Sequence, residues 1–273
     1  MIMKNKYFTF FPLFLLMLSS YAATADAVVL SIAGTGDSQS LLKRLAAEFH
    51  QTVPGRDIIV SIPDSVGSSG GIKALAAGKV SLARTARPLK DGGKKQGLRQ
   101  FRFALSPVVI AVHPSVKGIN NISSRQVSEI YSGQIRNWKQ LGGEKHPIYA
   151  IDREAGDSSR SILEKHLDGF PKGKTSAKIF YTTPEAEAAI AEHKFTIGFL
   201  PLSVAKSHGL KVLSVDGIKP TEGNVIKDDY KYVTPFYIVS RAKPSAAEKT
   251  FIDFLYTEQA KKVIRASGSV PTK

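Results

Sequence analysis

The stretch that decides the fold reads REAGDSSR and covers residues 153–160. It follows a short apolar run at residues 147–151 and precedes residues 161–167, whose apolar side chains recur at helical spacing. This pattern predicts a turn that leads from a strand into a helix. Because the first N–H groups of a helix lack intrahelical partners and carry the positive end of its dipole, such a turn can bind an anion.

The side chains of this turn would add to an anion site. Ser158 and Ser159 offer hydroxyl donors, and Arg153 and Arg160 offer guanidinium groups that suit an oxyanion. A plainer interpretation fits the same residues, in which Asp157 or Ser158 caps the helix and the arginines are solvated. The stretch alone leaves both interpretations open.

Earlier turns repeat the same arrangement. A predicted strand at residues 27–33 ends in a small polar turn at 34–38, and a second strand at 58–62 is followed by a glycine- and serine-rich turn at 67–71. A third short strand ends in the polar segment 84–88. One glycine-rich turn is weak evidence, because turns use glycine whatever their function. Several such turns at the carboxyl ends of strands indicate a ligand site, because ligands bind at that edge of open α/β sheets.

The rest of the chain alternates strands with helices and contains no internal repeat or low-complexity linker. Apolar patterns predict strands at 103–113, 196–200, 211–215 and 232–240, and helices at 123–131, 184–193 and 245–256. This alternation favours an α/β fold.

Residues 1–25 have the pattern of a secretory signal peptide. Two lysines precede a nearly unbroken apolar run at residues 7–18, and small residues that suit cleavage follow at 23–25 or 25–27. The apolar run is shorter than the ~20 residues that span a bilayer, which argues against a membrane anchor. We therefore expect an exported, soluble protein of the periplasm.

The chain has 273 residues and no cysteine. Without disulfides, the fold must be stabilised by its apolar core. The length after the signal peptide is sufficient for such a core and favours two lobes over one.

The formal net charge is +15, and it falls by two when Lys4 and Lys6 leave with the signal peptide. A positive field of this size favours anionic partners, whether small oxyanions, nucleic acid or an anionic surface. The basic residues are spread over the whole chain, with no long run and no interleaved aromatic residues. Nucleic acid is therefore not an expected partner, and most of these residues are interpreted as a solvated surface.

No catalytic motif is present in the sequence. The six histidines are scattered without metal-binding spacing, and the glycine-rich turn at 67–71 lacks the GK[ST] ending of a nucleotide-binding loop. We expect no catalytic residue, no metal and no cofactor, and hence a protein that is not an enzyme.

Five motifs together carry a resemblance to a known family. They are SSGGIK at 68–73, ARPLK at 86–90, IYSGQIRNWK at 130–139, the turn at 153–160, and GSVP at 268–271. In this order and spacing they resemble the phosphate-binding proteins of phosphate ABC importers. The resemblance covers essentially the whole chain after the signal peptide.

The resemblance implies an α/β, two-lobed type II periplasmic-binding-protein fold with two crossover strands. Residues 1–25 would be the signal peptide, residues 26–114 and 233–273 the first lobe, and residues 115–232 the second. The two crossings would lie near residues 113–115 and 232–235.

The resemblance also implies a ligand site made of hydroxyl groups, helix-end amides and one arginine. On this basis the expected ligand-binding residues are Thr35, Gly36, Asp37, Ser68, Ser69, Thr85, Arg153, Asp157, Ser158 and Ser159.

This sequence departs from the family pattern at two positions. The family's usual turn reads Gly-Ser-Gly-Thr-Arg where this chain has Gly-Asp-Ser-Ser-Arg at 156–160, so Asp157 replaces a serine where an anion would lie. Phosphate-specific members also use an aspartate at the position of Ala86 to accept the proton of the ligand. Asp157 could take over that acceptor role or could serve only as the helix cap, and the sequence leaves both possibilities open.

The expected function is capture of phosphate or a similar oxyanion in a cleft between the lobes, for delivery to an ABC permease in the inner membrane. A monomer is expected. The alternative is an exported basic protein of the same fold that binds polyanions or envelope components and has no role in transport.

Overall fold

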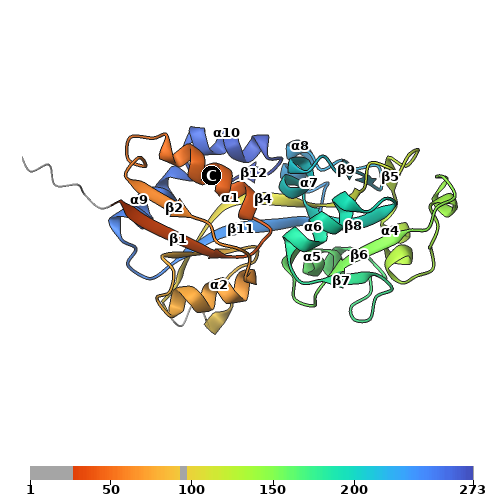
Figure 1. Cartoon of the computed structure of the whole chain (residues 1–273), viewed down its shortest axis with the longest axis horizontal. Coiled ribbons are helices and arrows are strands. Elements are labelled where there is room, and N and C mark those ends of the chain that lie inside the picture. Colours follow the sequence, from red (N-terminus) through yellow and green to blue (C-terminus); the bar gives the residue numbers. More distant parts are fainter. Residues whose placement is uncertain (1–26, 93–96, 273) are drawn as a thin grey trace, which may run out of the picture.

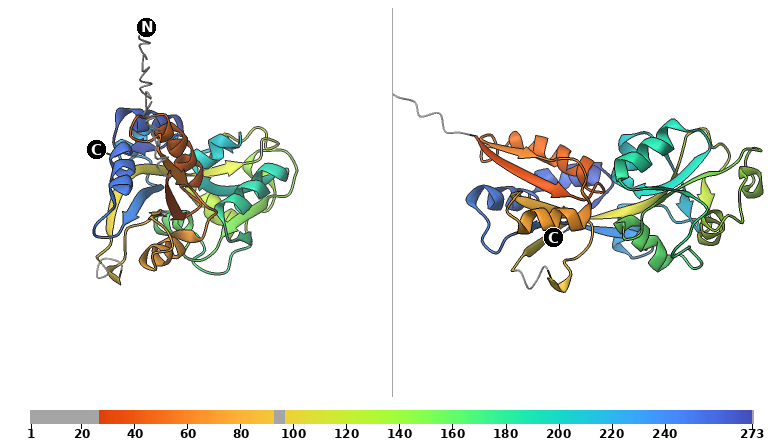
Figure 2. Two further views of the ribbon diagram at one scale, coloured as in Figure 1. Left: turned by 60° about the vertical axis from the view of Figure 1, so that its left-hand side comes forward. Right: turned by 60° about the horizontal axis from the view of Figure 1, so that its bottom comes forward.

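The computed structural model describes residues 27–92 and 97–272, so the predicted signal peptide lies outside the described residues. The described chain forms two α/β lobes placed end to end, and the long strands β4 (Arg99–Val112) and β11 (Val233–Ser240) run between them (Figures 1 and 2). This arrangement confirms the expected two-lobed fold with two crossover strands.

The first lobe is built on a sheet with the strand order β2-β1-β3-β11-β4. Its remaining elements are β1 (Val28–Gly34), β2 (Ile58–Ser61), β3 (Leu82–Thr85), β12 (Val270–Pro271), α1 (Gln39–His50), α2 (Gly67–Ala76), α9 (Ala246–Phe254) and α10 (Glu258–Ala266). Strand β1 is parallel to β2 and β3, whereas β11 is antiparallel to both β3 and β4. The turns that follow these parallel strands therefore lie at one common edge of the sheet.

The second lobe continues the sheet in the order β4-β8-β6-β7. Its strands are β5 (Asn121–Ile122), β6 (Tyr149–Arg153), β7 (Lys178–Phe180), β8 (Thr196–Pro201), β9 (Lys211–Val212) and β10 (Ser214–Val215). Its helices are α4 (Ser124–Tyr131), η1 (Trp138–Leu141), α5 (Ser158–His166), α6 (Thr183–Glu192) and α7 (Leu202–Ser207), and the short α8 (Glu222–Ile226) follows. Strands β6, β7 and β8 are parallel to one another.

Strand β4 belongs to both lobes. Residues 99–107 pair with β11 in the first lobe, and residues 108–112 pair with β8 in the second. The segment just before β11 stays beside β4, because the N–H of Val108 donates to the carbonyl of Tyr232 at 2.8 Å. The two connections therefore lie side by side. The lobe limits proposed at residues 114 and 232 stay a prediction.

Apolar side chains cover both faces of the sheet in the first lobe. Helix α1 buries Leu41, Leu42, Leu45 and Phe49, the positions that its sequence spacing predicts, against strands and against Phe251 of α9. Helix α2 packs on the opposite face through Leu75. The end of β1 and the start of α2 are thereby held between two packed layers.

The second lobe has the same layered construction. Helices α4 and α5 bury Val127 and Leu163 on one face, and helices α6 and α7 bury Ile190 and Ala205 on the other. Side-chain caps fix the starts of its helices: Ser123 caps α4 and Thr182 caps α6, each within a capping box. Packing and capping together set where these helices begin.

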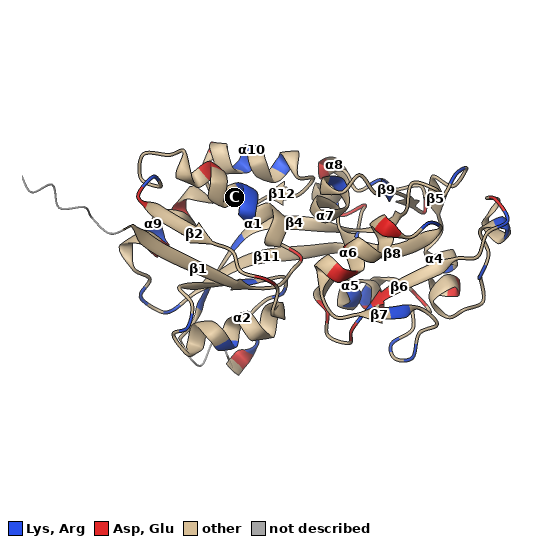
Figure 3. Cartoon of the chain, viewed as in Figure 1, with Lys and Arg blue, Asp and Glu red and all other residues tan. Residues whose placement is uncertain are grey.

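Within residues 27–92 and 97–272, no helix has the length and apolar character needed to cross a membrane. Lysine and arginine residues lie along both lobes and are not gathered on one element (Figure 3).

Candidate functional site

A polar cavity of about 240 Å³ lies where the two lobes face each other. Seven of the ten expected ligand residues line it: Thr35, Gly36, Ser68, Ser69, Arg153, Asp157 and Ser158. The turn after β1 and the first turn of α2 supply the first four, and the segment from the end of β6 to the start of α5 supplies the others. The structure therefore brings turns that are far apart in the sequence to one cavity.

A buried arginine supports the first-lobe wall from behind. Arg84 of β3 is fully buried, and its guanidinium donates to the carbonyls of Thr35 and Pro63, each at 2.8 Å, and to that of Ile32. Burial lowers the pKa of Arg84 to about 10, while Asp64 acts in the opposite direction, so the side chain stays charged at neutral pH. Arg84 thus fixes the turns around the cavity without lining it.

The hydroxyl groups of α2 face the strand that follows. Ser68 Oγ accepts a hydrogen bond from the N–H of Ala86 at 3.2 Å, and Ser69 Oγ accepts one from Arg87 Nη2 at 2.9 Å. Arg87 also lines the cavity and is half-buried. It is therefore a second cation of the site, which the sequence comparison with the family did not single out.

Thr85 does not line the cavity, although it was expected to. Its side chain is fully buried, and Oγ1 donates to the carbonyl of Arg87 at 2.9 Å. The hydroxyl proton of Thr85 is therefore used by the segment that follows β3.

Arg153, at the end of β6, reaches the cavity from the second lobe with an exposed fraction of only 5%. Its Nε donates to the carbonyl of Phe180 at 3.2 Å, Nη1 donates to Thr183 Oγ1 at 2.9 Å, and Nη2 donates to the carbonyl of Tyr181 at 3.3 Å. Nη2 also pairs with Asp157 Oδ2 at 3.0 Å. All three nitrogens of this guanidinium therefore have partners within its own lobe.

Asp157 is the N-cap of α5. Its Oδ1 accepts a hydrogen bond from the N–H of Arg160 at 2.9 Å, and its side chain is 7% exposed. Burial raises the pKa of Asp157 to about 7, with a further upward contribution from Asp37, whereas Arg153 and the backbone hydrogen bonds act to lower it. Asp157 is therefore the helix cap, as the plainer interpretation expected, but Arg153 and Arg160 are buried and not solvated, and the same carboxyl group also lines the cavity.

Asp37 and Ser159 do not line the cavity, because their side chains contact each other at one side of it. Ser159 Oγ donates to Asp37 Oδ2 at 3.1 Å, and Thr183 Oγ1 donates to Asp37 Oδ1 at 2.7 Å. Gly36 lies against the same threonine, since a Cβ at this position would be 2.9 Å from Thr183 Cβ. The two lobes are thus in direct contact at one side of the cavity.

Comparisons with known proteins bear on this geometry. A family model described as PBP superfamily domain matches residues 21–259. This chain belongs to the PBP superfamily.

Several known members of the PBP superfamily resemble the chain over most of its length. The phosphate-binding protein PstS of Bacillus subtilis is 27% identical over 246 residues, which cover 89% of this chain and 80% of that protein. PstS of Borreliella burgdorferi is 26% identical and covers 90% of each chain. A solved structure of a candidate phosphate ABC transporter substrate-binding protein from Clostridium perfringens, with bound phosphate, has a TM-score of 0.79 at 26% identity and covers 90% of this chain and 100% of its own.

Arg160 takes a different place from the one that the sequence suggested. It is 3% exposed and turned away from the cavity, where it pairs with Asp152 at 3.1 Å and with Glu164. It also donates to the carbonyl of Pro171 at 2.8 Å and lies over the ring of Phe170. The expectation that Arg160 adds a cation to the anion site is therefore wrong, because its position on α5 directs it to the buried carboxylate of β6.

Thr183 is a site residue that the sequence reasoning missed. It begins α6 directly after β7, so it occupies one more turn between a strand and a helix. The sequence feature that could have identified this position is the capping box of Thr182 and Glu185, because a capping box marks the start of a helix.

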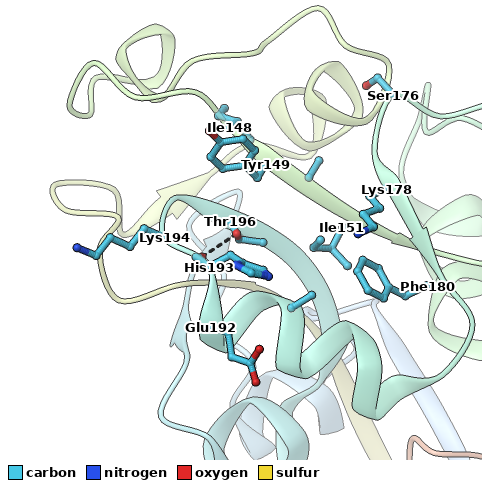
Figure 4. Close-up of a pocket in the computed structure, with 12 residues that line it drawn as sticks. Ile148, Tyr149, Ile151, Ser176, Lys178, Phe180, Glu192, His193, Lys194 and Thr196 are labelled. Atoms are coloured by element: carbon cyan, nitrogen blue, oxygen red, sulfur yellow. Dashed lines mark hydrogen bonds between the residues drawn. The ribbon is translucent and has the colours of Figure 1, made fainter.

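A second cavity, of about 570 Å³, lies on the second lobe beside β6, β7 and α6 (Figure 4). Ile148, Ile151 and Phe180 give it an apolar wall, and Lys178 and Glu192 also line it. None of the ten expected ligand residues lines this cavity. Among residues 27–92 and 97–272, no group of histidine and carboxylate side chains is arranged to hold a metal ion.

Proposed function

We propose that this protein is a solute-binding protein that captures phosphate or a related oxyanion in the cavity between its lobes. The observation that carries the proposal is the convergence of hydroxyl groups, a helix start and two arginines from both lobes on one polar cavity. Hydroxyl and amide donors with guanidinium groups match the chemistry of a tetrahedral oxyanion.

The known members of the family support the choice of ligand and the transport role. The relatives carry the name phosphate-binding protein, and a solved structure from Vibrio cholerae with 26% identity is described as an ABC-type phosphate transport receptor. On this basis the protein would be exported to the periplasm, would act as a monomer without cofactor or catalysis, and would deliver its ligand to an ABC permease of the inner membrane.

Closure of the lobes around the ligand is part of the proposal. The hydrogen bonds from Ser159 and Thr183 to Asp37 give the closed arrangement contacts of its own. A bound anion would add contacts to both lobes, and it would therefore favour the closed form over the open one.

Calorimetry on the exported form of the protein tests the proposal. Titration with phosphate should give one saturable site, and affinity should change little between about 50 and 200 mM salt, because few counterions are released from a small ligand. A polyphosphate titration serves as the comparison. If phosphate does not bind, and polyphosphate binds at several sites with steep salt dependence, the protein is instead the basic polyanion-binding protein that its net charge of +15 also allows.

A further inference from the structure

We propose that the carboxylate of Asp157 is an internal counter-anion, which occupies part of the oxyanion site and competes with the ligand for Arg153. This inference rests on the proposed function and names the residue that would set the affinity and the charge preference of the site. The contacts of Arg153, the placement of Asp157 and the charges around it each support the inference.

Most N–H donors of Arg153 already have partners. A guanidinium has five N–H groups, and both of those on Nη2 are directed at Tyr181 O and Asp157 Oδ2. Nε donates to the carbonyl of Phe180, and Nη1 donates to the hydroxyl of Thr183. Among the described residues this leaves a single N–H of Nη1 for a ligand. A paired, two-point contact between Arg153 and an oxyanion therefore requires an existing partner to leave, and Asp157 is the only charged one.

The carboxylate of Asp157 lies where an oxyanion would be attracted. Asp157 lines the cavity, and it caps α5 by accepting from the N–H of Arg160. The start of a helix and an adjacent guanidinium are the two features that attract an oxyanion. The carboxylate of Asp157 already interacts with both, because it accepts a hydrogen bond from the N–H of Arg160 and pairs with the guanidinium of Arg153. The cap and the ion pair also hold the side chain in this position.

The charges around Asp157 disfavour additional negative charge. The charged groups that face Asp157 are Arg153 of β6 and, from the other lobe, Asp37 in the turn after β1. Two carboxylates thus oppose one guanidinium on this side of the cavity, and the pKa of Asp157 is raised to about 7. A fully ionised ligand would bring more negative charge to the same place. Protonation of Asp157 would remove this repulsion and would let the carboxyl group donate a hydrogen bond to the ligand.

The test compares variants that remove the charge of Asp157 but keep its cap. Asparagine and serine are both good N-cap residues, so D157N and D157S should fold, and thermal unfolding checks that they do. At pH about 8, both variants should bind phosphate more tightly than the wild type, by about tenfold, the ratio that corresponds to a change of one pKa unit. Glu192→Gln removes one exposed carboxylate from the same lobe outside this cavity, and we expect less than a twofold change for it.

Sulfate provides a second readout, because it carries no proton at neutral pH. The wild type should bind sulfate more tightly at pH about 6 than at about 8, as Asp157 takes up its proton, whereas D157N should show no such dependence. Folded D157N and D157S that bind phosphate no more tightly than the wild type would overturn the proposal. If neither the wild type nor any variant binds phosphate, the proposed function itself fails, and the inference falls with it.

Discussion

Thr183 Oγ1 donates a hydrogen bond to Asp37 Oδ1 at 2.7 Å, although the two residues are 146 positions apart and belong to different lobes. The same hydroxyl accepts from Arg153 Nη1 at 2.9 Å. Thr183 therefore connects the cation of the second lobe to a carboxylate of the first. The state of the cavity and the relative position of the lobes are linked through this one side chain.

This contact leads to a prediction about closure. Gly36→Ala should place a methyl group about 3 Å from Thr183 Cβ and so hold the lobes apart. We expect phosphate to reduce the radius of gyration of the wild type, as measured by solution scattering, and to reduce it less in the variant. Gly223→Ala in α8 is the matched control, because a Cβ there meets nothing within 4 Å. Identical scattering curves for the wild type with and without saturating phosphate would contradict closure.

A second prediction concerns Arg153. Arg153→Ala should abolish phosphate binding and should also destabilise the protein by about 3 kcal/mol, because it leaves the buried carboxylate of Asp157 without its cation. Urea unfolding gives the loss of stability and calorimetry gives the loss of binding. The double variant that also carries Asp157→Asn should recover much of the stability but not the binding. Unchanged affinity in Arg153→Ala would remove this arginine from the site.

A third prediction concerns Arg87, the second cation of the cavity. Arg87→Gln should weaken phosphate binding by about tenfold, since a charge-assisted hydrogen bond to a ligand contributes roughly 1.5 kcal/mol. Stability should change little, because among the described residues the guanidinium donates only to Ser69 and to the carbonyl of Pro88. Arg99→Gln, at an exposed position on β4, controls for the change in net charge. Equal affinities of the two variants would show that Arg87 does not contact the anion.

The pH dependence of stability gives a fourth prediction. The pKa of Asp157 is raised from 3.8 to about 7 on folding, so the folded state binds the proton more strongly. Its contribution to stability is therefore complete below pH about 4 and is lost as the pH rises to about 7, by no more than about 4 kcal/mol. Urea unfolding of the wild type and of Asp157→Asn between pH 4 and 8 gives two curves of unfolding free energy against pH. The difference between these curves measures the contribution of Asp157.

The difference between those curves is needed because other groups titrate in the same range. Burial raises the pKa of Glu187 and lowers the pKa values of His113 and His166. The histidines contribute stability that increases with pH, opposite in sign to Asp157. Parallel curves for the wild type and the variant would show that the carboxyl of Asp157 has an ordinary pKa.

The helices and the turns of this fold could be predicted from local patterns. The spacing of Leu41, Leu45 and Phe49 predicts α1, because one helical face must be buried, and the small polar residues before α2 and α5 predict turns at helix starts. The gathering of the first-lobe turns at one edge followed from the parallel arrangement of their strands.

The partners of individual side chains could not be predicted in the same way. Nothing in the order of residues 153–160 indicates that Arg153 reaches the cavity while Arg160 turns to Asp152. That choice depends on how α5 packs against β6, which is a tertiary property. The contact between Asp37 and Thr183 depends on the placement of two lobes, and no local pattern carries this information.

The position of β11 in the sheet has a consequence for the order in which the chain can fold. Strand β11 lies between β3 and β4, although these two are consecutive in the sequence and β11 comes well over a hundred residues later. During synthesis, the first lobe therefore has a gap in its sheet until nearly the whole chain has emerged. Pairing between such distant segments is slow to form. We expect the new chain to remain incompletely folded through most of its synthesis, which is the condition that passage through a secretion channel requires.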